Sequence, residues 1–167
     1  MPGLMIISGG QSGVDRAVLD AALALAISYA GFCPRGGWAE DLTQPPGLLA
    51  RYPLLRETPS AEPAQRTEWN VRASDALMIL IGGGGLAASP GTALAHDLAT
   101  RAGKPALVIS LNDPDAATSA ARWLDGVLAA HTADTPLKLG IGGPRESEAP
   151  GIYAKALAAL QDVLRAR

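Results

Sequence analysis

The sequence predicts an α/β fold in which a mostly parallel sheet is covered by helices on both faces, a three-layer sandwich. Short apolar runs alternate with helical patterns along the chain, and this alternation is typical of parallel sheets built by right-handed crossovers. The 167 residues have the length of one ordinary domain, and 48% of them are hydrophobic, which is enough to bury a core. We therefore expect residues 1–167 to form a single ligand-binding domain.

Four apolar runs are predicted to be buried strands. Each is short and leads into glycine-rich or polar turn residues, as expected inside a parallel sheet. The expected strands are residues 4–7, 76–81, 106–111 and 137–141. A weaker pattern at residues 29–33 is compatible with a fifth strand.

Five segments have helical periodicity, and they follow or separate the predicted strands. They are residues 14–27, 65–73, 92–102, 116–129 and 152–165. In the last, apolar residues recur at three- and four-residue spacing, which predicts a packing helix. Ser12 precedes the first helix and is interpreted as its N-cap, with Asp15 opposing the helix dipole.

Residues 34–63 contain six prolines and no clean periodicity. This predicts an unusually long irregular segment for a compact domain. Long ordered loops commonly carry function, so this segment is a candidate cover for a ligand site. The sequence leaves open whether it acts as a lid.

The 19 glycines are concentrated in turns at predicted strand ends and helix starts. In an open parallel sheet, ligands bind outside the carboxyl ends of the strands. Glycine lets the backbone approach a ligand, and free N–H groups at a helix start attract anions. The turns therefore predict a crevice for a phosphate or similar oxyanion. They are residues 8–13, 82–85, 89–92 and 140–147.

Several polar residues near these turns can take either a structural or a binding role. Ser12 and Thr92 offer hydroxyls, and Arg145 offers a guanidinium. Asp15 is either a carboxylate at a helix start or a contact to a ribose hydroxyl or a bound cation. Arg35 is either a solvated loop charge or a clamp on an anion.

Other sequence motifs are weak or absent. Residues 82–87 formally fit a dinucleotide fingerprint, but no acidic residue follows about 20 positions later at a strand end. Residues 103–105 are not a phosphate-binding P-loop because the Ser or Thr is missing. One cysteine, Cys33, and two histidines cannot supply the spacings of a structural zinc site. We therefore expect no structural metal.

Charge and hydropathy exclude other classes of protein. The net charge of −2 provides no broad basic field for nucleic acid. No window approaches 18 uninterrupted apolar residues, and the amino terminus has neither the basic nor the apolar region of a signal peptide. We expect a cytoplasmic protein that binds neither nucleic acid nor a membrane.

Seven motifs, taken together, resemble the family named putative molybdenum carrier. They occur in order over nearly the whole chain. They are residues 7–16, 33–36 with 39–41, 55–58, 66–72 with 74–75, 91–92, 103–105, and 143–147 with 150–153. The family is a circularly permuted, YpsA-like branch of the SLOG superfamily of Rossmann-like domains, which are related to the lysine-decarboxylase-like LOG proteins.

This resemblance implies the same crevice as the turn chemistry, with molybdenum cofactor or a nucleotide as its anionic ligand. It implies a carrier or nucleotide-binding protein. The predicted ligand-binding residues are Gly9, Gly10, Gln11, Ser12, Gly13, Asp15, Arg35, Gly91, Thr92, Gly143, Arg145, Glu146 and Ser147.

The alternative function is hydrolysis of a nucleotide derivative, as in the phosphoribohydrolase relatives. Those relatives have a glutamate three residues after the Gly-Thr pair, and the resemblance places Ala95 there. This departure disfavours hydrolysis and leaves the catalytic residues unknown. Glu40, Asp41 or Glu146 would be the acid or base in that alternative.

Two further expectations follow from composition. Alanine-rich helices at residues 14–27 and 152–165 could leave a face for a homo-oligomer.

Few aromatic side chains are available for stacking a base, chiefly Trp38, Tyr52 and Trp69. This scarcity favours an oxyanion-binding crevice over a base-reading one.

Overall fold

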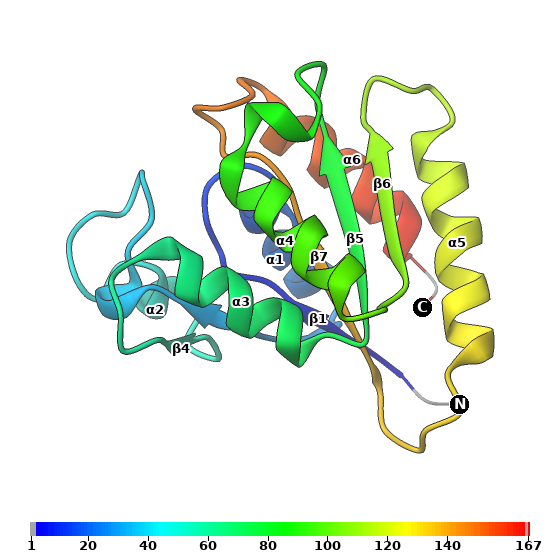
Figure 1. The fold of residues 1–167 in the computed structure, drawn as a ribbon, viewed down its shortest axis with the longest axis horizontal. Helices are drawn as coiled ribbons and strands as arrows, with labels where there is room; N and C mark the ends of the chain where they lie inside the picture. Colours follow the sequence, from blue (N-terminus) through cyan, green and yellow to red (C-terminus); the bar gives the residue numbers. More distant parts are fainter. Residues whose placement is uncertain (1–2, 166) are drawn as a thin grey trace.

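The computed structural model describes residues 3–165 and 167, and it shows a five-stranded parallel sheet between helices (Figure 1). The strand order is β2-β1-β7-β5-β6, and every neighbouring pair is parallel. These strands are β1 (Leu4–Ile7), β2 (Ser28–Ala30), β5 (Ala76–Ile81), β6 (Ala106–Ser110) and β7 (Leu137–Gly142). The predicted α/β fold is confirmed.

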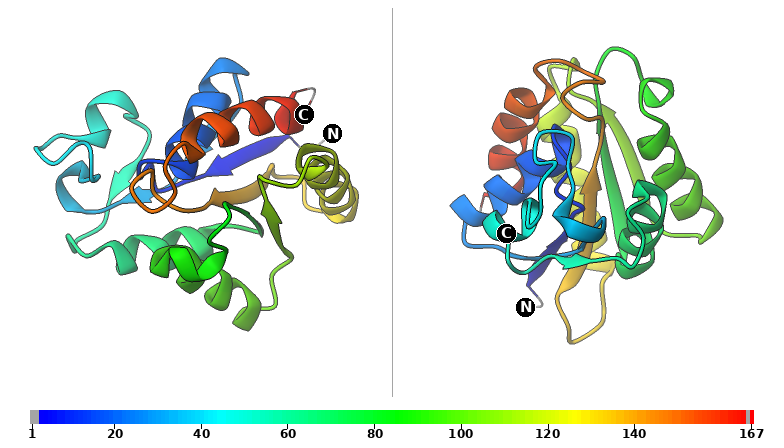
Figure 2. Two further views of the ribbon diagram at one scale, coloured as in Figure 1. Left: turned by 90° about the horizontal axis from the view of Figure 1, so that it is seen from above. Right: turned by 90° about the vertical axis from the view of Figure 1, so that its left-hand side faces the viewer.

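Helices cover both faces of this sheet. On one face α1 (Val14–Ala24) packs against α6 (Ile152–Leu164), and α5 (Ala116–Ala130) packs beside α6. On the other face α3 (Pro63–Ala73) packs against α4 (Pro90–Arg101). Figure 2 shows α1 and α6 above the sheet and α3 and α4 below it. The cavity described below lies on the α3 and α4 side.

The core is centred on β1, β7 and β5. Ile6 of β1 is paired in register with Leu139 of β7, and both side chains are fully buried. Strands covered on both faces are expected to be continuously apolar, which explains why these runs could be recognised in the sequence. Small residues such as Ala17 and Ala156 let α1 and α6 pack closely.

The start of α1 differs from the sequence-based expectation. Gly13, with φ 81°, occupies the N-cap position, and no side chain caps the helix. A Cβ atom at Gly13 would lie 2.3 Å from the carbonyl oxygen of Pro144. The interpretation of Ser12 as the N-cap is therefore wrong, because this close approach requires glycine. The helix also ends at Ala24 rather than at residue 27.

The weak strand pattern at residues 29–33 corresponds to two strands in different sheets. β2 pairs with β1, whereas β3 (Phe32–Cys33) pairs with β4 (Arg56–Glu57) in a separate two-stranded sheet. Gly31 lies between them with φ 140°. The predicted fifth strand is therefore confirmed as β2 of the main sheet, and only its expected extension to residue 33 is wrong, because the chain leaves this sheet at Gly31.

The segment from Pro34 to Pro63 consists mostly of turns and loops, as the sequence predicts, but it is interrupted by short regular elements. It contains a 3-10 turn at Arg35–Gly37, a short helix α2 (Leu48–Arg51) and strand β4. Leu48 and Tyr52 are fully buried, and the Tyr52 hydroxyl donates to Asp20 of α1 at 2.5 Å. These tertiary contacts, which periodicity does not reveal, order the segment.

In the described part of the chain, every helix is too short or too polar to cross a membrane.

Candidate functional site

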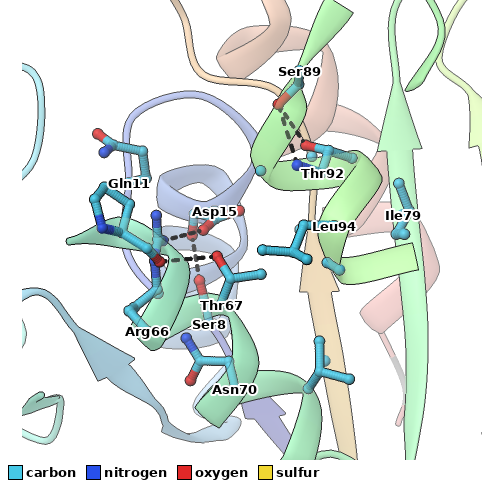
Figure 3. Close-up of a pocket in the computed structure, with 18 of the residues that line it drawn as sticks. Ser8, Gln11, Asp15, Arg66, Thr67, Asn70, Ile79, Ser89, Thr92 and Leu94 are labelled. Atoms are coloured by element: carbon cyan, nitrogen blue, oxygen red, sulfur yellow. Dashed lines mark hydrogen bonds and ion pairs between the residues drawn. The ribbon is translucent and has the colours of Figure 1, made fainter. Parts of the chain in front are cut away.

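A cavity of about 500 Å³ lies at the carboxyl ends of β1 and β7 and beside the middle of β5, between the sheet and helices α3 and α4 (Figure 3). Its volume is in the range of small-molecule sites. Sheet residues such as Ile79 and Gly142 form one wall. Residues of α3 and the first turns of α4 form the opposite side. The carboxyl ends of the strands therefore border a space large enough for a cofactor-sized ligand.

Arg66 of α3 is the most buried cation in the cavity wall. Its residue exposure is 7%, and its Nη1 atom donates to Asp15 Oδ2 at 3.2 Å (Figure 3). Its Nε atom donates to the carbonyl of Pro63 at 3.4 Å. No described residue accepts a hydrogen bond from Nη2. Arg66 therefore has donor capacity that a ligand can use.

Gly9 makes room for this arginine. A Cβ atom at Gly9 would lie 2.2 Å from Arg66 Nη1 and 2.6 Å from Arg66 Cδ. Both distances are far shorter than normal contacts, so any larger residue would displace the guanidinium. The glycine turn at residues 8–13 thus brings its backbone close to the cavity and also leaves room for the side chain of Arg66.

Asp15 lies in the first turn of α1 and shares the cavity with Arg66. Burial raises the pKa of the Asp15 carboxyl above its usual value, although the Arg66 charge and the Gly143 N–H act in the opposite direction. Burial likewise lowers the pKa of Arg66, while Asp15 acts to raise it. An arginine remains protonated under these conditions. The pair therefore places a fixed cation beside a carboxylate.

The end of α3 is held by Lys104, which belongs to the Gly-Lys-Pro motif at residues 103–105. Its Nζ atom donates to the carbonyls of Val71 at 2.8 Å, Arg72 at 3.0 Å and Ser74 at 2.5 Å. Orphan carbonyls at a helix end need such partners. This lysine is thus a structural cap for the helix that carries Arg66.

The amino terminus of α4 faces the cavity opposite Arg66. Ser89 is the N-cap, and its hydroxyl accepts from Thr92 N at 3.4 Å and lies 2.8 Å from Thr92 Oγ1. Pro90, Gly91 and Thr92 all line the cavity. Because Pro90 has no N–H and Ser89 caps Thr92 N, the anion-binding features of this helix start are Gly91 N and the helix dipole.

Arg145 contributes a second cation to the cavity wall. Its guanidinium lies 5.6 Å from the ring centroid of Trp38, and its backbone N–H donates to Glu148 Oε1 at 2.9 Å. Arg145 is half-buried, in contrast to Arg66. It therefore lies at the more open side of the cavity.

Glu40 fastens the first glycine turn to the loop that follows β7. Its carboxylate accepts from the hydroxyls of Ser12 and Ser147, and from Ser147 N at 3.1 Å. Ser12 Oγ also accepts from Glu146 N at 3.1 Å. We call Ser12, Glu40, Glu146 and Ser147 the Glu40 clasp. It lies outside the cavity lining and joins segments far apart in the sequence.

Gln11 connects the clasp to the cavity. Its Oε1 atom accepts from Ser12 N at 3.0 Å and Glu40 N at 2.9 Å, which fixes the direction of the amide. Gln11 Nε2 is buried and has no hydrogen-bond partner in the described part of the chain. An unsatisfied buried donor costs about 1–3 kcal/mol.

The structure separates the predicted ligand-binding residues into three groups. Seven line the cavity: Gly9, Gln11, Asp15, Gly91, Thr92, Gly143 and Arg145. Five lie in the adjoining turns and not in its lining: Gly10, Ser12, Gly13, Glu146 and Ser147. Arg35 lies instead in a second cavity.

Sequence reasoning did not assign Arg66 a binding role. It recognised the short helix that carries this residue, but an arginine among charged helix residues is typical of a solvated surface. The contact that distinguishes Arg66, its ion pair with Asp15, joins residues 51 positions apart. The glycine at position 9 was the available signal, because it marks a close approach.

The carboxylates considered for hydrolysis have structural partners. Asp41 forms a two-pronged ion pair with Arg16 at 2.8 and 2.9 Å. Glu146 accepts from the backbone N–H groups of Gly151 and Tyr153 at the start of α6. Glu40 is held in the clasp. These three groups do not line the cavity.

The helix position at which the hydrolase relatives have a glutamate provides no carboxylate here. Ala95 lines the cavity. Asp97 is exposed and pairs with Arg101 at 3.1 Å, so it does not replace the missing group. Hydrolysis by the scheme of those relatives is therefore disfavoured.

Among residues 3–165 and 167, no cluster of three or more His, Cys, Asp or Glu side chains is placed to hold a metal ion. Cys33 is buried, and burial raises the pKa of its thiol to about 11. A protonated, buried thiol is a poor nucleophile and a poor metal ligand.

A parallel sheet with helices on both faces and a cavity at the carboxyl ends of its strands defines a Rossmann-like α/β protein. Within this class, the family described as "Circularly permutated YpsA SLOG family" matches residues 6–164. The chain therefore belongs to the circularly permuted YpsA branch of the SLOG family.

One solved structure supports this assignment. It is the "Putative molybdenum carrier protein" from Syntrophus aciditrophicus SB, which shares 34% sequence identity with this chain. The similarity covers 98% of this chain and 96% of that chain, with a TM-score of 0.81. Among proteins with curated functions, none matches significantly.

Proposed function

We propose that this protein is a carrier that holds a phosphate-bearing, anionic small molecule in the cavity beside Arg66. Molybdenum cofactor and nucleotides are the candidate ligands. The observation that carries this proposal is the buried Arg66 guanidinium, whose Nη2 group has no acceptor among the described residues, in the wall of a cavity of about 500 Å³. Charge-assisted hydrogen bonds from arginine to a phosphate are among the strongest in proteins.

The start of α4 supports an anion at the same place. Pro90 has no N–H and Ser89 caps Thr92 N, so Gly91 N is the donor that α4 can offer there, and the helix dipole is positive at this end. Gln11 adds a buried donor without an acceptor near the cavity. A ligand with several oxygen acceptors would satisfy donors from α3, α4 and the first glycine turn together.

The charge balance favours an organic anion over a bare oxyanion. Asp15, Glu62 and Glu148 line the cavity together with Arg66 and Arg145. Carboxylates repel a free oxyanion but accept hydrogen bonds from hydroxyl and ring N–H groups. A phosphorylated molecule that also has a sugar or heterocycle fits both kinds of group.

The name of the structural relative from S. aciditrophicus makes molybdenum cofactor a specific candidate cargo. No described cluster of side chains could ligate the metal. The chain would therefore hold such a cargo through its organic and phosphate groups, with Arg66 and the start of α4 binding the phosphate.

Native mass spectrometry of the freshly purified protein tests this function. A retained mass would identify a nucleotide or a pterin cofactor directly. Calorimetric titration with AMP then tests the site. We expect Arg66→Gln to weaken AMP binding by at least about tenfold, because charged hydrogen bonds contribute about 1.5–3 kcal/mol.

Arg145→Ala is a second variant for the same titration. Arg66→Gln leaves Asp15 without its partner and can destabilise the fold, so thermal unfolding of both variants must be measured. Half-buried Arg145 can be truncated with a smaller effect on stability. If both variants bind AMP as tightly as the unmodified protein does, the assigned site is wrong.

A further inference from the structure

A second cavity, of about 300 Å³, lies next to the first. Glu62 and Pro63, at the start of α3, line both cavities. The start of α3 therefore forms part of the wall of both spaces.

The walls of the second cavity suit a flat, apolar ring. Trp38, Pro45, Ala61 and Pro63 provide apolar surface, while Arg35, Glu62 and Thr43 provide polar groups. Stacking on an aromatic face combined with a few polar edge contacts is how proteins hold heterocycles. The apolar surface would not help to bind inorganic phosphate.

Trp38 connects the two cavities. It lines the second one, and the guanidinium of Arg145, which lines the first, lies 5.6 Å from its ring centroid. The other two aromatic side chains considered for stacking are engaged elsewhere. Tyr52 is fully buried, and the Trp69 ring packs edge-on against Phe32 with centroids 5.1 Å apart.

The backbone around the second cavity is held in place before any ligand binds. Gly36 N donates to Glu57 Oε2 at 2.7 Å, and Arg35 N donates to the carbonyl of Ser60 at 3.0 Å. Gly36 adopts φ 80°, and a Cβ atom there would contact Pro45 at 3.4 Å. A preorganised wall reduces the entropy lost on binding.

We propose that the second cavity binds a planar heterocycle of the same ligand against Trp38, while the anionic group of that ligand binds beside Arg66. This inference rests on the proposed function and narrows it. The ligand class becomes a phosphate joined to a flat heterocycle, as in a nucleotide or a pterin phosphate. The scarcity of aromatic residues is then no argument against recognition of a ring, because one suitably placed indole suffices.

The test compares ligands with and without a ring. AMP, neopterin monophosphate and ribose 5-phosphate are titrated into the full chain by calorimetry. We expect Trp38→Ala to weaken binding of AMP or neopterin monophosphate by about tenfold, since stacking contributes about 1–3 kcal/mol. Binding of ribose 5-phosphate should change by less than about twofold. Whichever ring compound binds more tightly identifies the class of heterocycle.

Two control variants accompany Trp38→Ala. Trp38→Phe keeps an aromatic face and should retain most of the affinity for the ring compound. Trp123→Phe alters a tryptophan of α5, which packs on the other side of the molecule, and should leave all three affinities unchanged. Thermal unfolding shows whether each variant is folded.

Three outcomes would overturn the proposal that the second cavity binds the heterocycle of the ligand against Trp38. In one, Trp38→Ala leaves binding of AMP and neopterin monophosphate unchanged. In another, it weakens ribose 5-phosphate equally, which would mean that Trp38 acts through Arg145. In the third, neither ring compound binds more tightly than ribose 5-phosphate. The proposed function fails separately if Arg66→Gln leaves every affinity unchanged, and wild-type protein that binds none of the probes would overturn both proposals.

Discussion

Gly9 is the residue that permits Arg66 to enter the cavity wall. The guanidinium and the Cδ atom occupy the space in which a Cβ atom at position 9 would lie. Arg66 is buried and paired with Asp15, so it has few alternative positions. A single methyl group at Gly9 therefore acts on the binding site through a neighbouring side chain.

We expect Gly9→Ala to weaken AMP binding by about tenfold or more, because the displaced guanidinium can no longer reach the phosphate. Calorimetric titration measures the change. Gly126→Ala in α5 is the control, since Gly126 lies outside the cavity lining and a Cβ atom there would have no neighbour within 4 Å. Equal affinities in the two variants would contradict the role given to Gly9.

At the level of residues, glycine turns after strands pointed to the end of the sheet where the cavity beside Arg66 lies. The binding roles given to the residues there stay predictions. Ser12 was misassigned because its partner, Glu40, is 28 positions away. Arg66 was missed for the same reason. Pairwise contacts over long separations are set by the tertiary fold and leave no local pattern.

At the level of elements, the Glu40 clasp is another contact between segments that are far apart in the sequence. It joins the first glycine turn to the loop between β7 and α6. Burial raises the pKa of the Glu40 carboxyl, but hydrogen bonds from Ser12 and Ser147 outweigh this effect and leave the pKa below its usual value. The clasp therefore contributes stability when Glu40 is ionised.

This stability is present above the usual glutamate pKa and is lost as pH falls through the lower value of the folded state. We expect the unmodified protein to lose thermal stability below about pH 5, and Glu40→Gln to lose less over the same range. Thermal unfolding at pH 7 and pH 4 measures this difference. Exposed Asp162→Asn on α6 is the control.

Asp41 also makes the stability of the unmodified protein and of the Glu40→Gln variant depend on pH. Hydrogen bonds from Arg16 hold the pKa of Asp41 below its usual value, even though burial opposes them. Glu40→Gln therefore removes only part of the pH dependence. A variant whose loss of stability between pH 7 and pH 4 equals that of the unmodified protein would show that the clasp does not depend on charge.

Among the elements, the four strong strands and the five helices were predicted because burial on one or both faces imposes a periodic pattern. The short elements between Pro34 and Pro63 were not predicted. α2 has four residues and β4 has two, too few to show a period. Their conformations depend on contacts with α1 and β3.

For the whole molecule, the α/β architecture could be predicted and the strand order could not. Residues 137–142 form a strand between β1 and β5, although they come from the last quarter of the chain. Alternation of strands and helices does not specify which strands become neighbours. The expected cytoplasmic location and homo-oligomer stay predictions.

The central position of β7 predicts a large effect of Leu139 on stability. This side chain is fully buried and lies opposite Ile6 and Ala76. We expect Leu139→Ala to lower the free energy of unfolding by about 2–5 kcal/mol, measured by urea denaturation. Leu23→Ala, at a side chain that is 52% exposed, should change it by less than about 0.5 kcal/mol.

The strand order also bears on how the chain folds as it is synthesised. β1 leaves the ribosome early, but its neighbour β7 is made only after β5 and β6. Until then, β1 with β2 and β5 with β6 are two separate pairs with apolar edges, and the space between them has no strand. Incomplete sheets of this kind are prone to aggregate. The cavity beside Arg66, which β7 lines, can therefore form only after residues 137–142 have emerged.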